Sequence, residues 1–173
     1  MHPLAKFRYC PVCGSTSFEE NSDKSKHCMH CGFEYFMNPS AANAAFILNA
    51  NGELLVLTRD RDPAKGTDDL PGGFVNIDET AEEGVVREVM EETGLHVDTA
   101  TYLFSIPNTY LYSGLGIKTL DSFFVCHVTN GEQAKAMDDA AACRWVALAD
   151  INPESFGLNS IRQGVQRFLA MHR

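Results

Sequence analysis

The stretch from Gly73 to Leu95 constrains the fold of this chain more than any other part. It reads GFVNIDETAEEGVVREVMEETGL. Thr80 and Glu83 have the spacing of a capping box at a helix start, and Gly94 suits the left-handed position after the last helical turn. Apolar residues recur between these ends with the helical period; they are Val85, Val86, Val89, Met90 and Thr93. The sequence therefore predicts an amphipathic helix between Thr80 and Gly94.

Three glutamates share one face of this predicted helix. Glu88, Glu91 and Glu92 stand at i, i+3 and i+4, nearly opposite the apolar side. Gly84, one turn earlier, leaves the acidic face uncrowded. Like charges this close weaken an isolated helix, so the cluster indicates a site for hard cations, and oxygen-only ligands suit magnesium or manganese. The alternative is a solvated helix face, which is the usual role of a run of glutamates.

The spacing of the whole segment resembles the Nudix box. Five residues separate Gly73 from Glu79, and seven more lead to REVMEETGL at residues 87–95. The preceding Leu-Pro-Gly at residues 70–72 resembles the usual lead-in. On this resemblance the chain is identified as a member of the Nudix hydrolase family.

The resemblance implies metal-dependent hydrolysis of the diphosphate linkage in a nucleoside diphosphate derivative. Divalent magnesium or manganese would neutralise the phosphates and lower the pKa of bound water. Glu88, Glu91 and Glu92 match the metal-binding glutamates, and Glu88 is also a candidate to orient or deprotonate the water. The backbone carbonyl of Gly73 matches a further metal ligand.

Other residues match supporting positions of the family. Arg87 and Glu79 match the pair that holds the loop against the helix, and the alternative is a surface ion pair contributing about 0–1 kcal/mol. Asp139, next to Asp138, occupies the stretch where many members place a general base, and the alternative is a solvated loop acid. Arg59, like Arg61, is a candidate for contact with substrate phosphate or else a surface charge.

A second motif lies near the N-terminus. CPVCG at residues 10–14 and CMHCG at residues 28–32 are two Cys-x-x-Cys knuckles, each followed by glycine. This spacing predicts one tetrahedral, four-thiolate zinc site, with the ligands Cys10, Cys13, Cys28 and Cys31. Disulfides and a redox pair are the alternatives. His27 and His30, beside the second knuckle, are spare ligands or surface residues.

The chain thus divides into a zinc ribbon over residues 1–38 and a Nudix domain over residues 39–173. The ribbon is too short to fold on an apolar core, so zinc would supply its folding energy. Four lysine or arginine residues balance four acidic ones over residues 1–38, which favours a role in stability or dimer contact over nucleic-acid binding. Cys126 and Cys143, in apolar stretches, are expected in the core.

Strand-like runs surround the predicted helix. They lie at residues 41–48, 54–58, 101–105, 119–128 and 144–148, and Asn51-Gly52 between the first two predicts a hairpin turn. A final helix begins near Asn159, with apolar residues on one side. We expect an α/β/α sandwich with a mixed sheet, as the Nudix resemblance also implies.

A zinc ribbon before a Nudix domain resembles the NADH pyrophosphatases, which also act on NAD-capped RNA. Their motif SQPWPFPxS corresponds here to SIPNTYLYS at residues 105–113, which lacks the tryptophan and the tandem prolines. ADP-ribose and related adenosine diphosphates are therefore as plausible as NADH. Tyr110 and Tyr112 are candidates to stack a base, worth about 1–3 kcal/mol, or to pack within a strand.

Composition narrows the partners. The net charge of −9 and the pI near 5.0 disfavour general polyanion binding, so a small nucleotide is the expected substrate. No apolar run approaches the ~20 residues of a membrane span, and the start MHPLAKFRYC lacks a signal-peptide core, which predicts a cytoplasmic protein. A homodimer is a further candidate. The alternatives in function are decapping of NAD-capped RNA and nucleotide sensing without catalysis, although the intact glutamates disfavour sensing.

Overall fold

The computed structural model describes residues 2–112, 114–129 and 133–172. The chain forms two compact units, Met1–Pro39 and Ser40–Arg173. Within the described residues, no helix has the length and apolar character that crossing a membrane requires.

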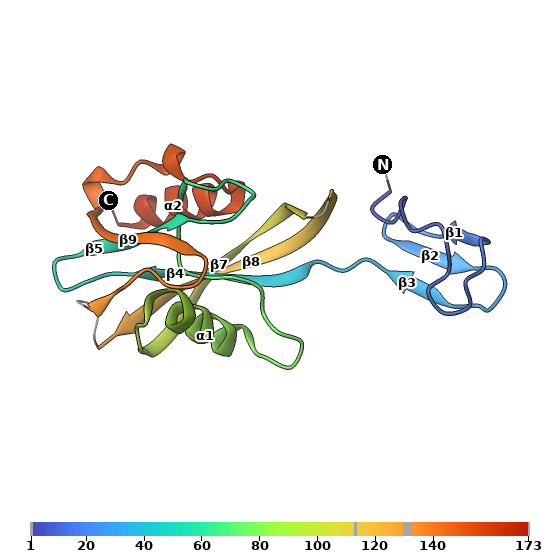
Figure 1. Cartoon of the computed structure of the whole chain (residues 1–173), viewed down its shortest axis with the longest axis horizontal. Coiled ribbons are helices and arrows are strands. Elements are labelled where there is room, and N and C mark those ends of the chain that lie inside the picture. Colours follow the sequence, from blue (N-terminus) through green and yellow to red (C-terminus); the bar gives the residue numbers. More distant parts are fainter. Residues whose placement is uncertain (1, 113, 130–132, 173) are drawn as a thin grey trace. The chain divides into compact units, whose positions relative to one another are not determined.

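The first unit is a small antiparallel sheet in the order β1-β2-β3 (Figure 1). Its strands are β1 (Phe18–Glu20), β2 (Ser25–Cys28) and β3 (Glu34–Phe36). The buried apolar side chains described here are few: Cys10, Phe18 and Cys28 form one cluster with Phe33 packed against it, and Leu4 is buried as well. Such a core is too small to stabilise a fold alone, which makes a metal the expected source of stability.

The four knuckle cysteines of the first unit converge. Their Sγ atoms all lie within 4.8 Å of one another, and Cys10–Cys31 and Cys13–Cys28 are separated by 3.7 Å and 3.6 Å. A tetrahedral zinc ion with Zn–S bonds of about 2.3 Å separates its sulfurs by about 3.8 Å. The cluster is therefore consistent with a zinc ribbon.

The backbone brings the cysteines together by using the same turn twice. Gly14 and Gly32 have φ of +73° and +77°, and each N–H donates to the carbonyl of the first cysteine of its knuckle at 2.9 Å. His30 is exposed and His27 half-buried, and neither belongs to the group of converging ligands. Among the described residues, the four cysteines alone thus form the group of candidate zinc ligands.

The ribbon geometry predicts about one tightly held zinc ion per purified chain. Removing zinc with a chelator should unfold the first unit and spare the second. Trp145, the single tryptophan, lies in the second unit, so its fluorescence should stay constant while the NMR signals of residues 8–36 collapse. Cys31→Ser should abolish zinc retention and Cys143→Ser should not. Elemental analysis without zinc, together with disulfides at Cys10 and Cys28, would contradict the prediction.

The second unit contains two three-stranded sheets, in the orders β4-β8-β7 and β6-β5-β9. The strands are β4 (Ser40–Ile47), β5 (Glu53–Arg59), β6 (Asp68–Asp69), β7 (Val97–Tyr112), β8 (Leu115–Val128) and β9 (Ala140–Ala147). β4 pairs with β8 in parallel, and the other pairs are antiparallel. The helices are α1 (Ala81–Thr93) and α2 (Asn159–Met171), with 3-10 turns η2 (Leu148–Asp150) and η3 (Pro153–Ser155).

The strands of this unit lie between α1 and α2 (Figure 1), and β4 and β5 are buried on both faces over most of their length. Successive residues of a strand point to opposite faces. Accordingly, Phe46 packs with Val165 and Phe168 of α2, whereas Ile47 packs with Val85 of α1. Two separate cores result, and the predicted α/β/α sandwich with a mixed sheet is confirmed.

Two of the predicted strand features form but differ in extent from the prediction. The strand predicted at residues 101–105 extends over all of β7, because it pairs with β8 almost to the tip of the hairpin. The turn at Asn51-Gly52 forms, with Gly52 at φ +75°, but the pairing beside it is the isolated bridge Leu48–Leu54, just beyond the end of β4. β4 and β5 then separate into different sheets, since β4 takes β8 as its ladder partner.

Helix α1 has both predicted ends. The Glu83 N–H donates to Thr80 Oγ1 at 3.1 Å and the Thr80 N–H to the Glu83 carboxylate at 2.8 Å, which completes the capping box. Gly94 adopts the left-handed conformation at φ 69°. Val85 and Val89 are fully buried, but Val86 is 37% exposed, so it does not belong to the apolar face.

Candidate functional site

A cavity of about 380 Å³ opens in the second unit. Its walls come from α1, the loop before it, strands β4, β5, β7 and β8, the start of α2 and residues 138–140. Seven carboxylates line it, namely Asp69, Glu88, Glu91, Glu92, Asp121, Asp138 and Asp139, and three arginines, namely Arg59, Arg61 and Arg87. The lining is therefore acidic and favours cations.

The loop before α1 approaches the glutamates because it has no side chains there. A Cβ at Gly73 would lie 2.6 Å from a carboxylate oxygen of Glu88, and the Gly72 N–H donates to Glu92 Oε2 at 2.9 Å. The Gly73 carbonyl accepts the Asn43 N–H at 2.8 Å. Its second lone pair is the one that could serve the predicted metal contact.

Gly84 has a different role from the one that its spacing suggested. It is buried, and a Cβ there would lie 2.8 Å from Asn43 Nδ2 on β4. The same Nδ2 donates to the Ala81 carbonyl at 3.0 Å. Gly84 thus lets the first turns of α1 pack closely on β4, rather than leaving the acidic face open.

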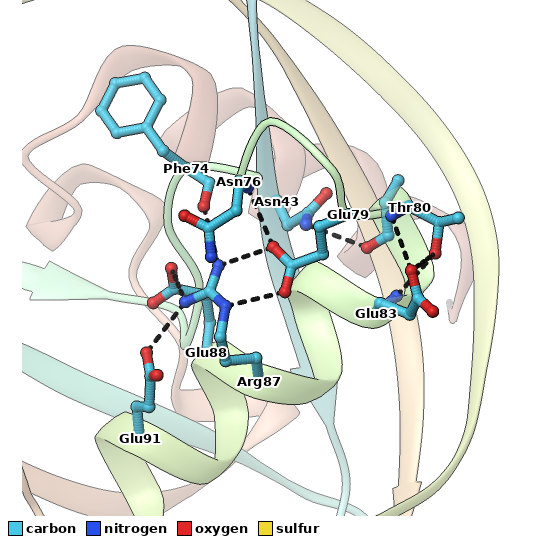
Figure 2. A network of polar contacts seen from close by, with 10 residues as sticks. Asn43, Phe74, Asn76, Glu79, Thr80, Glu83, Arg87, Glu88 and Glu91 are labelled. Atoms are coloured by element: carbon cyan, nitrogen blue, oxygen red, sulfur yellow. Dashed lines mark hydrogen bonds and ion pairs between the residues drawn. The ribbon is translucent and has the colours of Figure 1, made fainter.

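Arg87 joins the loop to the helix (Figure 2). Its guanidinium donates to both carboxylate oxygens of Glu79, at 2.8 Å and 2.9 Å, and to the Phe74 carbonyl at 3.0 Å. Its Nη1 also donates to Glu88 at 2.7 Å and Glu91 at 2.9 Å. Hydrogen bonding to Arg87 lowers the pKa of Glu79. Paired, partly buried contacts of this kind are stronger than a lone surface ion pair.

The three glutamates lie in different environments. The Glu91 side chain is 47% exposed and that of Glu88 only 16%, while Glu92 is 8% exposed. Glu92 therefore lies on the packed side of the helix, so the prediction that all three glutamates lie nearly opposite the apolar side was wrong for Glu92. Burial raises the pKa of Glu92 to about 8, and burial also raises the pKa of Glu88.

The donor set fits a hard divalent cation. Buried carboxylates whose pKa is raised by burial gain from a nearby positive charge, and oxygen ligands suit magnesium and manganese. Within the described residues, only the cysteine cluster brings three or more candidate ligand atoms within 4.8 Å of one another. Among the glutamates, Arg87 Nη1 lies between Glu88 and Glu91 and supplies the positive charge itself.

The remaining candidates are already paired. Arg59 forms an ion pair with Asp69, both nearly buried, and its Nε donates to the Pro63 carbonyl at 2.9 Å. Arg61 forms an ion pair with Asp139 at 2.5 Å. Burial, followed by the charge of Asp138, raises the pKa of Asp139. The structure thus places both Asp139 and Arg59 at the cavity, with Arg59 paired to the Asp69 carboxylate.

The two tyrosines differ. Tyr110 lines the cavity and meets Phe74 edge to face, with ring centroids 5.8 Å apart. Tyr112 is 63% exposed and does not line the cavity. Several cavity residues were not predicted, namely Asn43, Asp69, Phe74, Asn108, Thr119 and Asp121. A polar residue inside an apolar strand, such as Asp121 in LDSFFV, was the signal that could have found some of them.

The raised pKa of Glu92 predicts how stability varies with pH when no divalent cation is present. Between its ordinary value of 4.5 and about 8, folded Glu92 holds a proton that the unfolded chain releases. The free energy of unfolding should therefore fall as pH rises through this window, by at most about 5 kcal/mol at about 1.4 kcal/mol per pKa unit.

Thermal unfolding followed by Trp145 fluorescence, without added divalent cations, measures this slope. Glu92→Gln should flatten it, because the amide does not titrate. Glu82→Gln is the matched control, since Glu82 is exposed on the same helix. Equal slopes in the wild type and Glu92→Gln would show that Glu92 is not the titrating group.

Known proteins resemble this chain in both sequence and fold. The NAD-capped RNA hydrolase NudC of Escherichia coli is 30% identical over 152 residues, which are 86% of this chain and 56% of NudC. The chain thus spans about half the length of this curated relative. A NUDIX hydrolase from Nitrosomonas europaea has a TM-score of 0.75 at 18% identity, covering 94% of this chain and 90% of that one.

The NUDIX domain of NrtR from Shewanella oneidensis, solved with ADP ribose, has a TM-score of 0.65 at 18% identity, covering 80% of this chain and 91% of that one. At these identities the two structures show a shared fold. The NUDIX domain family itself matches residues 37–168, which is well over half of the chain. The chain therefore belongs to the NUDIX family.

Proposed function

We propose that this chain hydrolyses the diphosphate linkage of a nucleoside diphosphate derivative, with magnesium or manganese as the cation. The main support is the placement of Glu88 and Glu92, two carboxylates with raised pKa, at an acidic cavity. The cation, when bound, neutralises phosphate charge and lowers the pKa of a bound water. The loop that Arg87 holds positions the residues around it.

Each residue has a role in this proposal. Glu88, Glu91 and Glu92, with the Gly73 carbonyl, would hold the cations, which would supply the charge neutralisation that the diphosphate needs. Glu88 also orients or deprotonates the attacking water, because it lies where the loop meets the helix. Asp139 is the second candidate for the base, since it lines the same cavity.

The proposal assigns residues 1–38 to a structural zinc ribbon and residues 39–173 to the catalytic domain. A small nucleotide is the substrate, and a nucleic-acid partner is disfavoured by the acidic charge. The cytoplasmic location and the homodimer stay predictions.

NAD-capped RNA or NADH is the second candidate substrate, since the name of the NudC relative favours it. Against it, the segment Ser105–Ser113 has no tryptophan, and the single tryptophan of the chain is Trp145 in β9. Of the two tyrosines predicted to stack a base, Tyr110 lines the cavity and Tyr112 does not. Tyr110 alone is therefore kept as the candidate base contact. ADP-ribose or a related adenosine diphosphate therefore fits at least as well as NADH.

Replacing Glu92 with glutamine tests the proposed chemistry. The variant keeps the size of the side chain but removes one charge from the metal site, so turnover should fall at least ~100-fold, comparable to the loss of one strong electrostatic group. Glu88→Gln should be at least as severe if Glu88 handles the water proton. Phosphate-containing products are measured at limiting magnesium, with Glu82→Gln as the control. If folded Glu92→Gln turned over substrate at the wild-type rate, α1 would not be part of the catalytic centre.

A second experiment compares substrates. ADP-ribose should be hydrolysed with a kcat/KM that equals or exceeds that of NADH, because the motif that holds the nicotinamide dinucleotide is incomplete. The two compounds are assayed side by side with magnesium and with manganese. A strong preference for NADH would reverse the assignment and make Tyr110 or its neighbours the replacement for the missing motif.

A further inference from the structure

Part of the cavity wall has no role in the hydrolysis proposed above. Asn108 of β7 and Thr119 and Asp121 of β8 line the cavity together with Leu158 and Ile161 at the start of α2. Thr119, Asp121 and Phe123 stand at every second position of β8 and so share one face, and Phe123 packs in the α2 core. These polar side chains therefore point to the α2 side of the sheet.

Two of these polar groups are buried without a partner. Thr119 is 3% exposed and Asp121 6%. Within the described residues, neither Thr119 Oγ1 nor Asp121 Oδ1 has a hydrogen-bond partner. An unpartnered buried carboxylate or hydroxyl destabilises a fold, so its presence at a cavity wall indicates that a ligand completes it.

Asn108 determines which atoms remain free. Its Nδ2 donates to Asp121 Oδ2 at 3.2 Å, and its Oδ1 accepts the Thr109 N–H at 2.8 Å. Asp121 is thus held in one orientation with Oδ1 available. The wall offers a ligand one carboxylate acceptor and, from Thr119, one hydroxyl that can donate.

The cavity also has groups that suit a flat ring. Phe74, 44% exposed, and Tyr110 form an edge-to-face pair, and Leu158 and Ile161 add apolar surface. Aromatic side chains of this kind stack on any base and do not distinguish one from another. Selection between bases then falls to the polar groups on β8.

We propose that Asp121 and Thr119 recognise the amino edge of an adenine ring. Asp121 Oδ1 accepts a hydrogen bond from the exocyclic amino group, and Thr119 Oγ1 donates to the neighbouring ring nitrogen. Hypoxanthine has a carbonyl where adenine has the amino group, so its oxygen faces the carboxylate. Guanine presents two adjacent donors that match a carboxylate with both oxygens free, whereas Asn108 occupies Oδ2.

This recognition site adjoins the glutamates. After burial, the charge of Asp121 contributes to raising the pKa of Asp69, and the charge of Asp69 contributes to raising that of Glu92. The three carboxylates thus follow one another along the same cavity. The inference rests on the proposed function and specifies the base of its substrate.

The test compares ADP-ribose with inosine diphosphate ribose, in which a carbonyl replaces the purine amino group and the adjacent ring nitrogen N1 carries a proton. The wild type should prefer ADP-ribose in kcat/KM by about ten- to a hundredfold, as expected for one charge-assisted hydrogen bond. Asp121→Asn should bring the ratio close to one, and Thr119→Val should lower it in part. Asp98→Asn, the same change at an exposed position of β7, should leave the ratio unchanged.

Calorimetric binding of AMP and IMP to the intact wild-type chain, without divalent cations, separates this inference from the proposed function. If the chain binds AMP more tightly than IMP but hydrolyses neither ADP-ribose nor inosine diphosphate ribose, the proposed function is overturned and the recognition site stands. If it hydrolyses ADP-ribose and inosine diphosphate ribose equally and binds AMP and IMP equally, the recognition site alone is overturned. If Asp121→Asn does not fold, as judged by Trp145 fluorescence, Thr119→Val and the wild-type binding ratio decide.

Discussion

The site depends on the contact between the Arg87 guanidinium and the loop that precedes α1. Arg87 binds Glu79 with two hydrogen bonds and the Phe74 carbonyl with a third, so an irregular segment is held to a rigid helix. The loop in turn brings Gly72 and Gly73 against Glu92 and Glu88. Burial raises the pKa of these two carboxylates. The contacts of Arg87 with Glu79 and Phe74 keep the loop against them at the cavity.

Two apolar cores, one on each face of β4, support this contact between Arg87 and the loop. The α1 core supports the helix that carries the glutamates, while the α2 core supports the wall with Asp121 and Thr119. The cavity lies where polar residues interrupt these two cores. A change on one wall therefore need not disturb the other, because separate sets of apolar contacts support the two walls.

The sequence predicted well what depends on local chemistry. The ends of α1 follow from Thr80, Glu83 and Gly94, and the convergence of the cysteines follows from two knuckles with the same Cys-x-x-Cys-Gly pattern. The residues that were missed or misjudged depend on partners far away in the chain. Gly84 packs against Asn43, Asp121 meets Asn108 across a strand pair, and the ion-pair partner of Arg59, Asp69, was not predicted. No periodicity within one segment reports such pairings, since they arise only when the sheets assemble.

The bare backbone at Gly73 has a consequence for how this site can be altered. The nearest atoms to a methyl group at this position are those of the Glu88 carboxyl group, fifteen residues further along the chain. Gly73→Ala would thus displace that flexible side chain rather than the backbone. In genetic terms, this substitution between two uncharged residues would copy the phenotype of a lost glutamate, although the formal charge of the protein stays the same.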